Sequence, residues 1–152
     1  MTVFVRNLQR RYKIDTPRLR AMTREAVRLI DAPDEVIGII LVNDKQIADL
    51  NERFHHTPGP TDILTFQFPE LPGGELTISV ERAAANAERY QTTPSRELAL
   101  YVVHGILHLH GHNDLKARQR QRMRAAERRL LSRLGTKFDL SALVRNARQV
   151  KA

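Results

Sequence analysis

The segment Val102–Leu115, VVHGILHLHGHNDL, constrains the fold more than any other part of the chain. On a helix, its residues and those just before it are apolar on almost every side; these are Leu98, Tyr101, Val102, Val103, Ile106, Leu107 and Leu109. A helix without a polar face is buried in a core. Thr93-Pro94 offers an N-cap followed by proline at the first helical position. We therefore expect a central, buried helix from this point to about His110.

Two histidines interrupt this apolar helix. His104 and His108 stand four residues apart, so both imidazoles project from one face, about 6 Å apart along the axis. A helical histidine on an apolar face is often a core residue bonded to the backbone, but a pair at this spacing can chelate one metal ion. Gly111 can end the helix in the left-handed conformation. The chain can then reverse, and Asp114 can return to the same ion as a third ligand.

The resulting pattern, His-x-x-x-His-x-x-Gly-x-x-Asp, gives three protein ligands and leaves room for water, as in catalytic zinc sites. The chain has no cysteine, so histidine and carboxylate must supply the ligands. His110 and His112 compete with Asp114 for the third position. However, His110 lies roughly 200° around the helix from His108, and His112 follows the glycine closely. We predict a hydrolase whose zinc, bound by His104, His108 and Asp114, ionises a water molecule.

The remaining chain predicts short strands first and helices later. The expected strands are Val3–Asn7, Val36–Val42, Ile63–Phe68 and Glu75–Val80, of which the last two are close enough to form an antiparallel hairpin. The expected helices are Thr16–Ile30, Lys45–Phe54 with Asp44 as its cap, Glu81–Tyr90 and Lys116–Leu134, and a short C-terminal helix is expected after Gly135. This order indicates a single α+β domain over residues 1–152.

Composition narrows the class of protein. With 152 residues, 41% hydrophobic and 28% charged, the chain is typical of a globular protein with one core. No stretch approaches the ~20 apolar residues of a membrane helix, and the first residues lack the apolar core of a signal peptide. We therefore expect a cytoplasmic protein that does not bind membranes. The net charge of +8 suits a polyanion such as nucleic acid, although many basic proteins are merely soluble.

Basic residues crowd the helix that follows the proposed metal turn; they are Lys116, Arg118, Arg120, Arg122, Arg124, Arg128, Arg129 and Arg133. Such a helix can steer phosphates toward the metal. It can equally be a solvated helix face, because this helix has little aromatic interleaving that would indicate base stacking.

These segments resemble the YbeY-type family of rRNA maturation endoribonucleases, whose signature His-Gly-x-Leu-His-Leu-x-Gly-x-Asp-His stands here as HGILHLHGHND. The resemblance extends to LNERF (Leu50–Phe54), PTDILTF (Pro60–Phe66), GELTIS (Gly74–Ser79) and RELALYVVHG (Arg96–Gly105). It implies a mixed sheet, one zinc ion per chain and no small-molecule cofactor. It also implies cleavage of single-stranded RNA in ribosome maturation, notably at the 3′ end of 16S rRNA of the small subunit.

Two positions depart from the family pattern. Asp114 stands where the family usually has its third histidine. A carboxylate oxygen binds zinc at about 2.0–2.2 Å, but its charge would make the metal less electrophilic. His55 stands where an arginine commonly follows the LNxxY-type segment. In the family, this arginine helps to hold substrate phosphate. His55 and His56 either replace it in part or are solvated loop residues.

Two other functions fit parts of the pattern. Metzincin peptidases share the ligand spacing, but the glutamate that serves as their general base is replaced here by Gly105, which has no side chain to accept a proton. A non-catalytic ribosome-assembly factor whose zinc braces the fold fits the same sequence. RNA cleavage that depends on the metal would separate the nuclease from the assembly factor.

Overall fold

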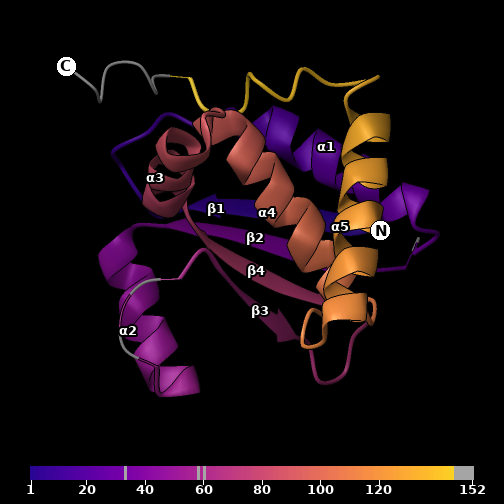
Figure 1. The fold of residues 1–152 in the computed structure, drawn as a ribbon, viewed down its shortest axis with the longest axis horizontal. Coiled ribbons are helices and arrows are strands. Elements are labelled where there is room, and N and C mark those ends of the chain that lie inside the picture. The colour runs from indigo at the N-terminus through magenta and orange to yellow at the C-terminus, as the bar shows by residue number, and fades with distance from the viewer. Residues whose placement is uncertain (33, 58, 60, 146–152) are drawn as a thin grey trace.

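The computed structural model describes residues 1–32, 34–57, 59 and 61–145. Four strands are described, β1 (Thr2–Asn7), β2 (Val36–Val42), β3 (Ile63–Gln67) and β4 (Gly73–Ser79). Five helices are described, α1 (Thr16–Leu29), α2 (Asp44–His55), α3 (Val80–Tyr90), α4 (Pro94–Leu109) and α5 (Ala117–Leu134) (Figure 1). The sheet order is β1-β2-β4-β3, with β2 parallel to both of its neighbours and β3 antiparallel to β4. The predicted α+β fold, its mixed sheet and the hairpin are confirmed.

One face of the sheet is covered by a thick layer of helices, and helix α4 lies at its centre. It contacts β3 and β4 below it, and α1, α3 and α5 pack around it (Figure 1). Leu98, Val102 and Ile106 are completely buried in the main core. The predicted central buried helix is therefore confirmed, and its burial follows from its apolar surface on nearly all sides. Within the described residues, no helix is both long enough and apolar enough to cross a membrane.

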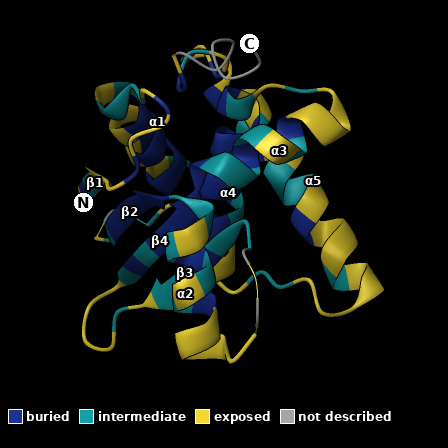
Figure 2. Cartoon of the chain, turned by 90° about the vertical axis from the view of Figure 1, so that its left-hand side faces the viewer, coloured by how far each residue is buried: buried dark blue, intermediate teal, exposed yellow. Residues whose placement is uncertain are grey.

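The opposite face of the sheet carries a thinner layer. Helix α2 contacts β3 and β4 there, around a small cluster formed by Ile40, Val42, Ile47 and Leu64. Figure 2 shows the contrast, because α4 is largely buried whereas α2 exposes much of its surface. Strand residues alternate between the two layers, so neighbours in the sequence belong to different cores.

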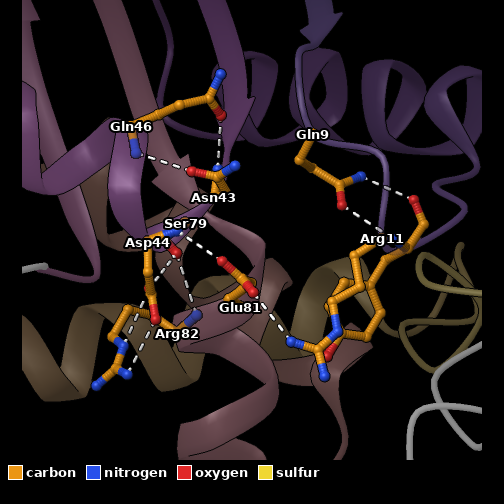
Figure 3. Close-up of polar contacts among 9 residues, drawn as sticks. Gln9, Arg11, Asn43, Asp44, Gln46, Ser79, Glu81 and Arg82 are labelled. Atoms are coloured by element: carbon orange, nitrogen blue, oxygen red, sulfur yellow. Dashed lines mark hydrogen bonds and ion pairs between the residues drawn. The ribbon is translucent and has the colours of Figure 1, made fainter.

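The start of α2 differs from the prediction by one residue. Asn43 caps the helix, and its side chain and that of Gln46 form a capping box. Asp44 is therefore not the cap. Its carboxylate instead accepts hydrogen bonds from Ser79 Oγ at 2.7 Å and from the Arg82 guanidinium (Figure 3). This ion pair ties the start of α2 to the start of α3.

The prediction of a short C-terminal helix is wrong for residues 136–145, which the structure describes. Residues 136–145 form turns, and Val144 makes an isolated antiparallel bridge with Ile14. The Val144 amide also donates to Ser95 Oγ at 2.8 Å. Leu143 and Val144 are buried in the main core in this conformation, so tertiary burial overrides the local helical preference. The remainder of the expected helix lies outside the described residues.

Candidate active site

Helix α4 presents its histidines from a fixed position on the sheet. Thr93 caps the helix by accepting from the Arg96 amide, and proline stands in the first turn. Gly105 faces the sheet so closely that a Cβ there would lie 2.7 Å from a methyl group of Leu76 and 2.8 Å from one of Ile63. A larger residue at this position would have to push these two side chains aside, so the glycine fits a close contact between α4 and the sheet. Gly105 also lacks the side chain that serves as the general base in metzincins.

His104 and His108 lie one turn apart on the same face of α4, as predicted. Their rings are parallel to within 6°, with centroids 6.5 Å apart. His104 is half-buried, whereas His108 is exposed. The helix thus presents two imidazoles with similar orientation in two different environments.

Glu127 of α5 holds the ring of His104. The Glu127 carboxylate and His104 Nδ1 are 2.5 Å apart, and the side chains are only 12% and 29% exposed. This hydrogen bond raises the pKa of His104, against the opposing effect of burial. A neutral ring whose Nδ1–H donates to a carboxylate keeps its lone pair on Nε2, which is how metal-binding histidines are commonly oriented. Glu127 is a partner that the sequence analysis missed.

Asp114 lies on the wall of a pocket of about 320 Å³ that His104 and Glu127 also line. Its negative charge is one of the smaller contributions that raise the pKa of His104. His108 does not line this pocket. Among the described residues, no group of three or more histidine or carboxylate side chains is close enough to hold a metal ion. The donor types suit zinc, but the three predicted ligands do not converge on one point.

The two competing histidines lie elsewhere. His110 Nδ1 donates to the Ile106 carbonyl at 2.7 Å, and its Nε2 lies 2.7 Å from the Glu35 carboxylate. His110 is therefore engaged on both nitrogens, away from the pocket. His112 follows Gly111, whose φ of +95° makes the predicted left-handed turn. This turn brings the chain toward Asp114.

Arginines of α5 give the pocket a positive rim. Arg120 and Arg124, one helical turn apart, both line it and are exposed. The other basic residues of the predicted series are exposed as well; within the described chain these are Lys116, Arg118, Arg122, Arg128, Arg129 and Arg133. Only part of the series thus lines the pocket, and the rest forms a solvated face.

A second carboxylate lines the same pocket. Asp62 accepts a hydrogen bond from Asn86 Nδ2 at 3.0 Å, and the same amide nitrogen lies 2.6 Å from the Tyr101 hydroxyl. Burial raises the pKa of Tyr101, so this phenol stays protonated at neutral pH. Neither Asp62 nor Tyr101 stands out from the sequence as a site residue. For Glu127, which was also missed, a signal exists, because it is the only acidic residue of α5 and lies beside the buried stripe of that helix.

His55 and His56 lie at the end of α2, apart from this pocket. His55 packs near Phe66, with ring centroids 6.4 Å apart, and His56 is the left-handed C-cap with φ of +54°. Neither lines the His104 pocket. The expectation that they partly replace the family arginine in holding substrate phosphate stays a prediction, and it would concern a surface outside the His104 pocket.

The fold and site define a small α+β protein with a histidine-bearing pocket rimmed by arginine. The family model described as Endoribonuclease YbeY matches residues 4–135. The chain therefore belongs to this family of nucleases, and the resemblance seen in its sequence is confirmed.

Relatives and a solved structure agree with this assignment. The chain is 32% identical over 121 residues to "Endoribonuclease YbeY" of Syntrophus aciditrophicus, covering 74% of this chain and 76% of the relative. It is 31% identical over 150 residues to the protein of that name from Desulforamulus reducens, covering 89% and 98%. The solution structure of TM1509 from Thermotoga maritima matches with a TM-score of 0.65 at 25% identity, covering 88% of this chain and 89% of that one.

Proposed function

We propose that this chain is a zinc-dependent endoribonuclease that cleaves single-stranded RNA during rRNA maturation, including the 3′ end of 16S rRNA. The observation that carries the proposal is the pair of His104 and Glu127 on the wall of an arginine-rimmed pocket. Membership of a family named for endoribonuclease activity supports the reaction class. Cytoplasmic location remains a prediction from the sequence.

The zinc ligands in this proposal are His104, His108 and Asp114. The parallel rings on α4 and the orientation of His104 by Glu127 support the first two. The position of Asp114 on the pocket wall, close enough to affect the pKa of His104, supports the third. Bound zinc would act as a Lewis acid toward a phosphoryl oxygen and supply an ionisable water.

The protein's own side chains suit an anionic, single-stranded substrate. Arg120 and Arg124 offer donors for phosphate oxygens at the rim. Glu127 fixes the orientation of His104 and holds the proton on Nδ1. Asp62 is held by Asn86 on the same wall and is available to accept a proton or a ribose hydroxyl hydrogen bond.

The test combines metal content with RNA cleavage. Zinc per chain is measured in purified wild type, Asp114→Ala and the neighbouring control His112→Ala, together with cleavage of a single-stranded RNA before and after chelation and zinc restoration. We expect about one zinc per wild-type and control chain, less in Asp114→Ala, and cleavage that follows zinc. Zinc loss in His112→Ala alone would contradict the ligand set. Zinc binding without cleavage that depends on it would favour the assembly factor.

A further inference from the structure

A second pocket, of about 310 Å³, opens on the face of the sheet that α4 does not cover. It is lined by residues of all four strands and of α2, among them Arg6, Ile40, Leu50, Phe54, Phe66 and Glu75. The sheet register explains this set, because Arg6 and Ile40 are paired across β1 and β2, and Glu75 and Phe66 are paired across β4 and β3. The pocket is therefore a feature of the sheet surface and does not depend on a loop.

The two pockets lie on opposite faces of the sheet. Ile63 lines the His104 pocket and approaches Gly105 of α4. Leu64 and Phe66 belong to the cluster on the α2 side. Because consecutive strand residues point to opposite faces, Ile63 and Phe66 face different layers.

Aromatic rings form one side of the second pocket. Phe54 is 56% exposed, and its ring meets that of Phe66 edge to face, with centroids 5.6 Å apart. Leu50 lies one turn earlier on α2 and also lines the pocket. An exposed phenylalanine held in a fixed orientation against a second ring presents a flat apolar surface on which another planar group can stack.

Charged groups without partners form the other side. In the part of the chain that the structure describes, neither the Arg6 side chain nor the Glu75 side chain makes a hydrogen bond or an ion pair. A pocket of this kind therefore offers five N–H donors and a carboxylate acceptor beside the aromatic rings. An apolar partner segment would bury both charges without compensation, which is unfavourable. The better-matched occupant is planar, carries N–H donors and is attached to an anion.

We propose that this pocket binds one unstacked base of a single-stranded RNA, with the base stacked on Phe54. The Glu75 carboxylate accepts hydrogen bonds from N–H groups on the edge of the base, and Arg6 pairs with a neighbouring phosphate. Guanine suits Glu75 best, because two adjacent N–H groups on its edge match the two carboxylate oxygens. The choice of RNA rests on the proposed function, but the site is separate from the His104 pocket and would contact a different part of the strand.

The test uses metal-free, full-length protein, so that cleavage does not interfere with binding. The probe is an eight-nucleotide uridine RNA that carries one central guanine, with a fluorescent label read by anisotropy. Stacking on an aromatic residue contributes about 1–3 kcal/mol per base, so we expect Phe54→Ala to weaken binding about 5- to 150-fold. The matched control is Tyr90→Ala, which removes an aromatic ring that is 62% exposed on α3, and it should bind like wild type.

A second variant reports directly on stacking. The chain contains no tryptophan, so Phe54→Trp places its single tryptophan in the pocket, where it can be excited selectively over the three tyrosines. We expect the RNA to quench its emission. We also expect Glu75→Gln to remove the advantage of the guanine-containing RNA over uridine alone. Equal affinity of wild type and Phe54→Ala would overturn the proposal. The proposal would also be overturned if the tryptophan emission of Phe54→Trp changed on adding an apolar dye but not on adding RNA. That result would indicate an apolar partner.

The outcomes separate this inference from the proposed function. Zinc-dependent cleavage in a protein whose RNA affinity is indifferent to Phe54 would remove only the second pocket. RNA binding that requires Phe54, in a protein that cleaves no RNA under any metal condition, would support the pocket and remove only the proposed nuclease activity.

Discussion

The two faces of the sheet are built differently. On the α4 face, two histidines are engaged in pairs, with His104 held by Glu127 and His110 by Glu35. On the α2 face, the side chains of Arg6 and Glu75 have no hydrogen-bond or ion-pair partner within the described residues, and Phe54 is more than half exposed. On the first face, these pairs fix the orientation of the two histidines in advance. The second keeps its polar groups available to a ligand.

This difference indicates two kinds of recognition. A reacting group must be held in one geometry, and paired, half-buried side chains achieve this. A base-binding surface gains its affinity from stacking and from hydrogen bonds made on binding. If the comparison is correct, substitutions on the α4 face should change stability and metal binding, whereas those on the α2 face should change RNA binding alone.

The largest expected difference concerns two glycines, one on each face. Gly105→Ala would press a Cβ against Leu76 and Ile63 in the packed core. Overpacking costs about 1–3 kcal/mol, of which the better helix propensity of alanine returns up to ~1 kcal/mol. In Gly38→Ala the Cβ would lie 2.4 Å from the ring of Phe4, a partly buried side chain of the edge strand that would have to move. We expect a smaller cost than for Gly105→Ala, because only this one side chain of the sheet edge is in the way.

Urea unfolding monitored by circular dichroism measures both variants. The contrast between the two faces is supported if the urea midpoints of the two variants differ while the denaturant dependence of their unfolding free energies equals that of wild type. Gly38→Ala as destabilising as Gly105→Ala would show that both faces are packed with the same tolerance, and the contrast between them would fail.

A second prediction concerns Glu127. Glu127→Gln keeps the size of the side chain but replaces the carboxylate that accepts from His104. Loss of such a partner typically weakens metal binding 10- to 100-fold, and we expect a zinc affinity reduced by about this factor. Competition with a chromogenic chelator measures it. Glu88→Gln, an exposed change on α3, is the control. Unchanged zinc affinity in Glu127→Gln would mean that Glu127 has only a structural role.

Local features of the chain were predicted well because their causes are local. The burial of α4 follows from its own apolar residues, and the turn at Gly111 follows from a residue that adopts φ of +95° without strain. The cap of α2 was misplaced by one position, because Asn43 and Asp44 are both good capping residues. The capping box with Gln46 favours Asn43. Asp44 instead pairs with Arg82, and that ion pair joins separate segments.

The partners of the site could not be predicted, because they depend on how distant segments meet. Glu127 reaches His104 from another helix, and Glu35 reaches His110 from the start of β2. The wrong C-terminal helix has the same origin, since Val144 is held by Ile14 and by core burial. The sequence shows which residues can bind a metal, but the side chains that orient them emerge only in three dimensions.

The smallest expected effect is a pH dependence of stability on the α4 face. The hydrogen bond to Glu127 raises the pKa of His104 in the folded, metal-free protein above its usual value of 6.5. The folded state therefore binds the proton more tightly than the unfolded state. The resulting stabilisation is fully present below pH 6.5 and is lost as the pH rises through the raised pKa. A hydrogen bond between charged groups contributes about 1.5–3 kcal/mol, and partial exposure of His104 places the expected effect at or below the lower end.

Urea unfolding of chelated protein between pH 5.5 and 8.5 tests this, with wild type compared against Glu127→Gln. The free-energy advantage of wild type should shrink as the pH rises. The α2-face variant Phe54→Ala should differ from wild type by the same amount at every pH, because Phe54 does not titrate and does not line the pocket of His104. A difference in unfolding free energy between wild type and Glu127→Gln that stays constant across this range would mean that His104 and Glu127 do not share a more tightly held proton. The electrostatic contrast between the two faces would then lose its main support.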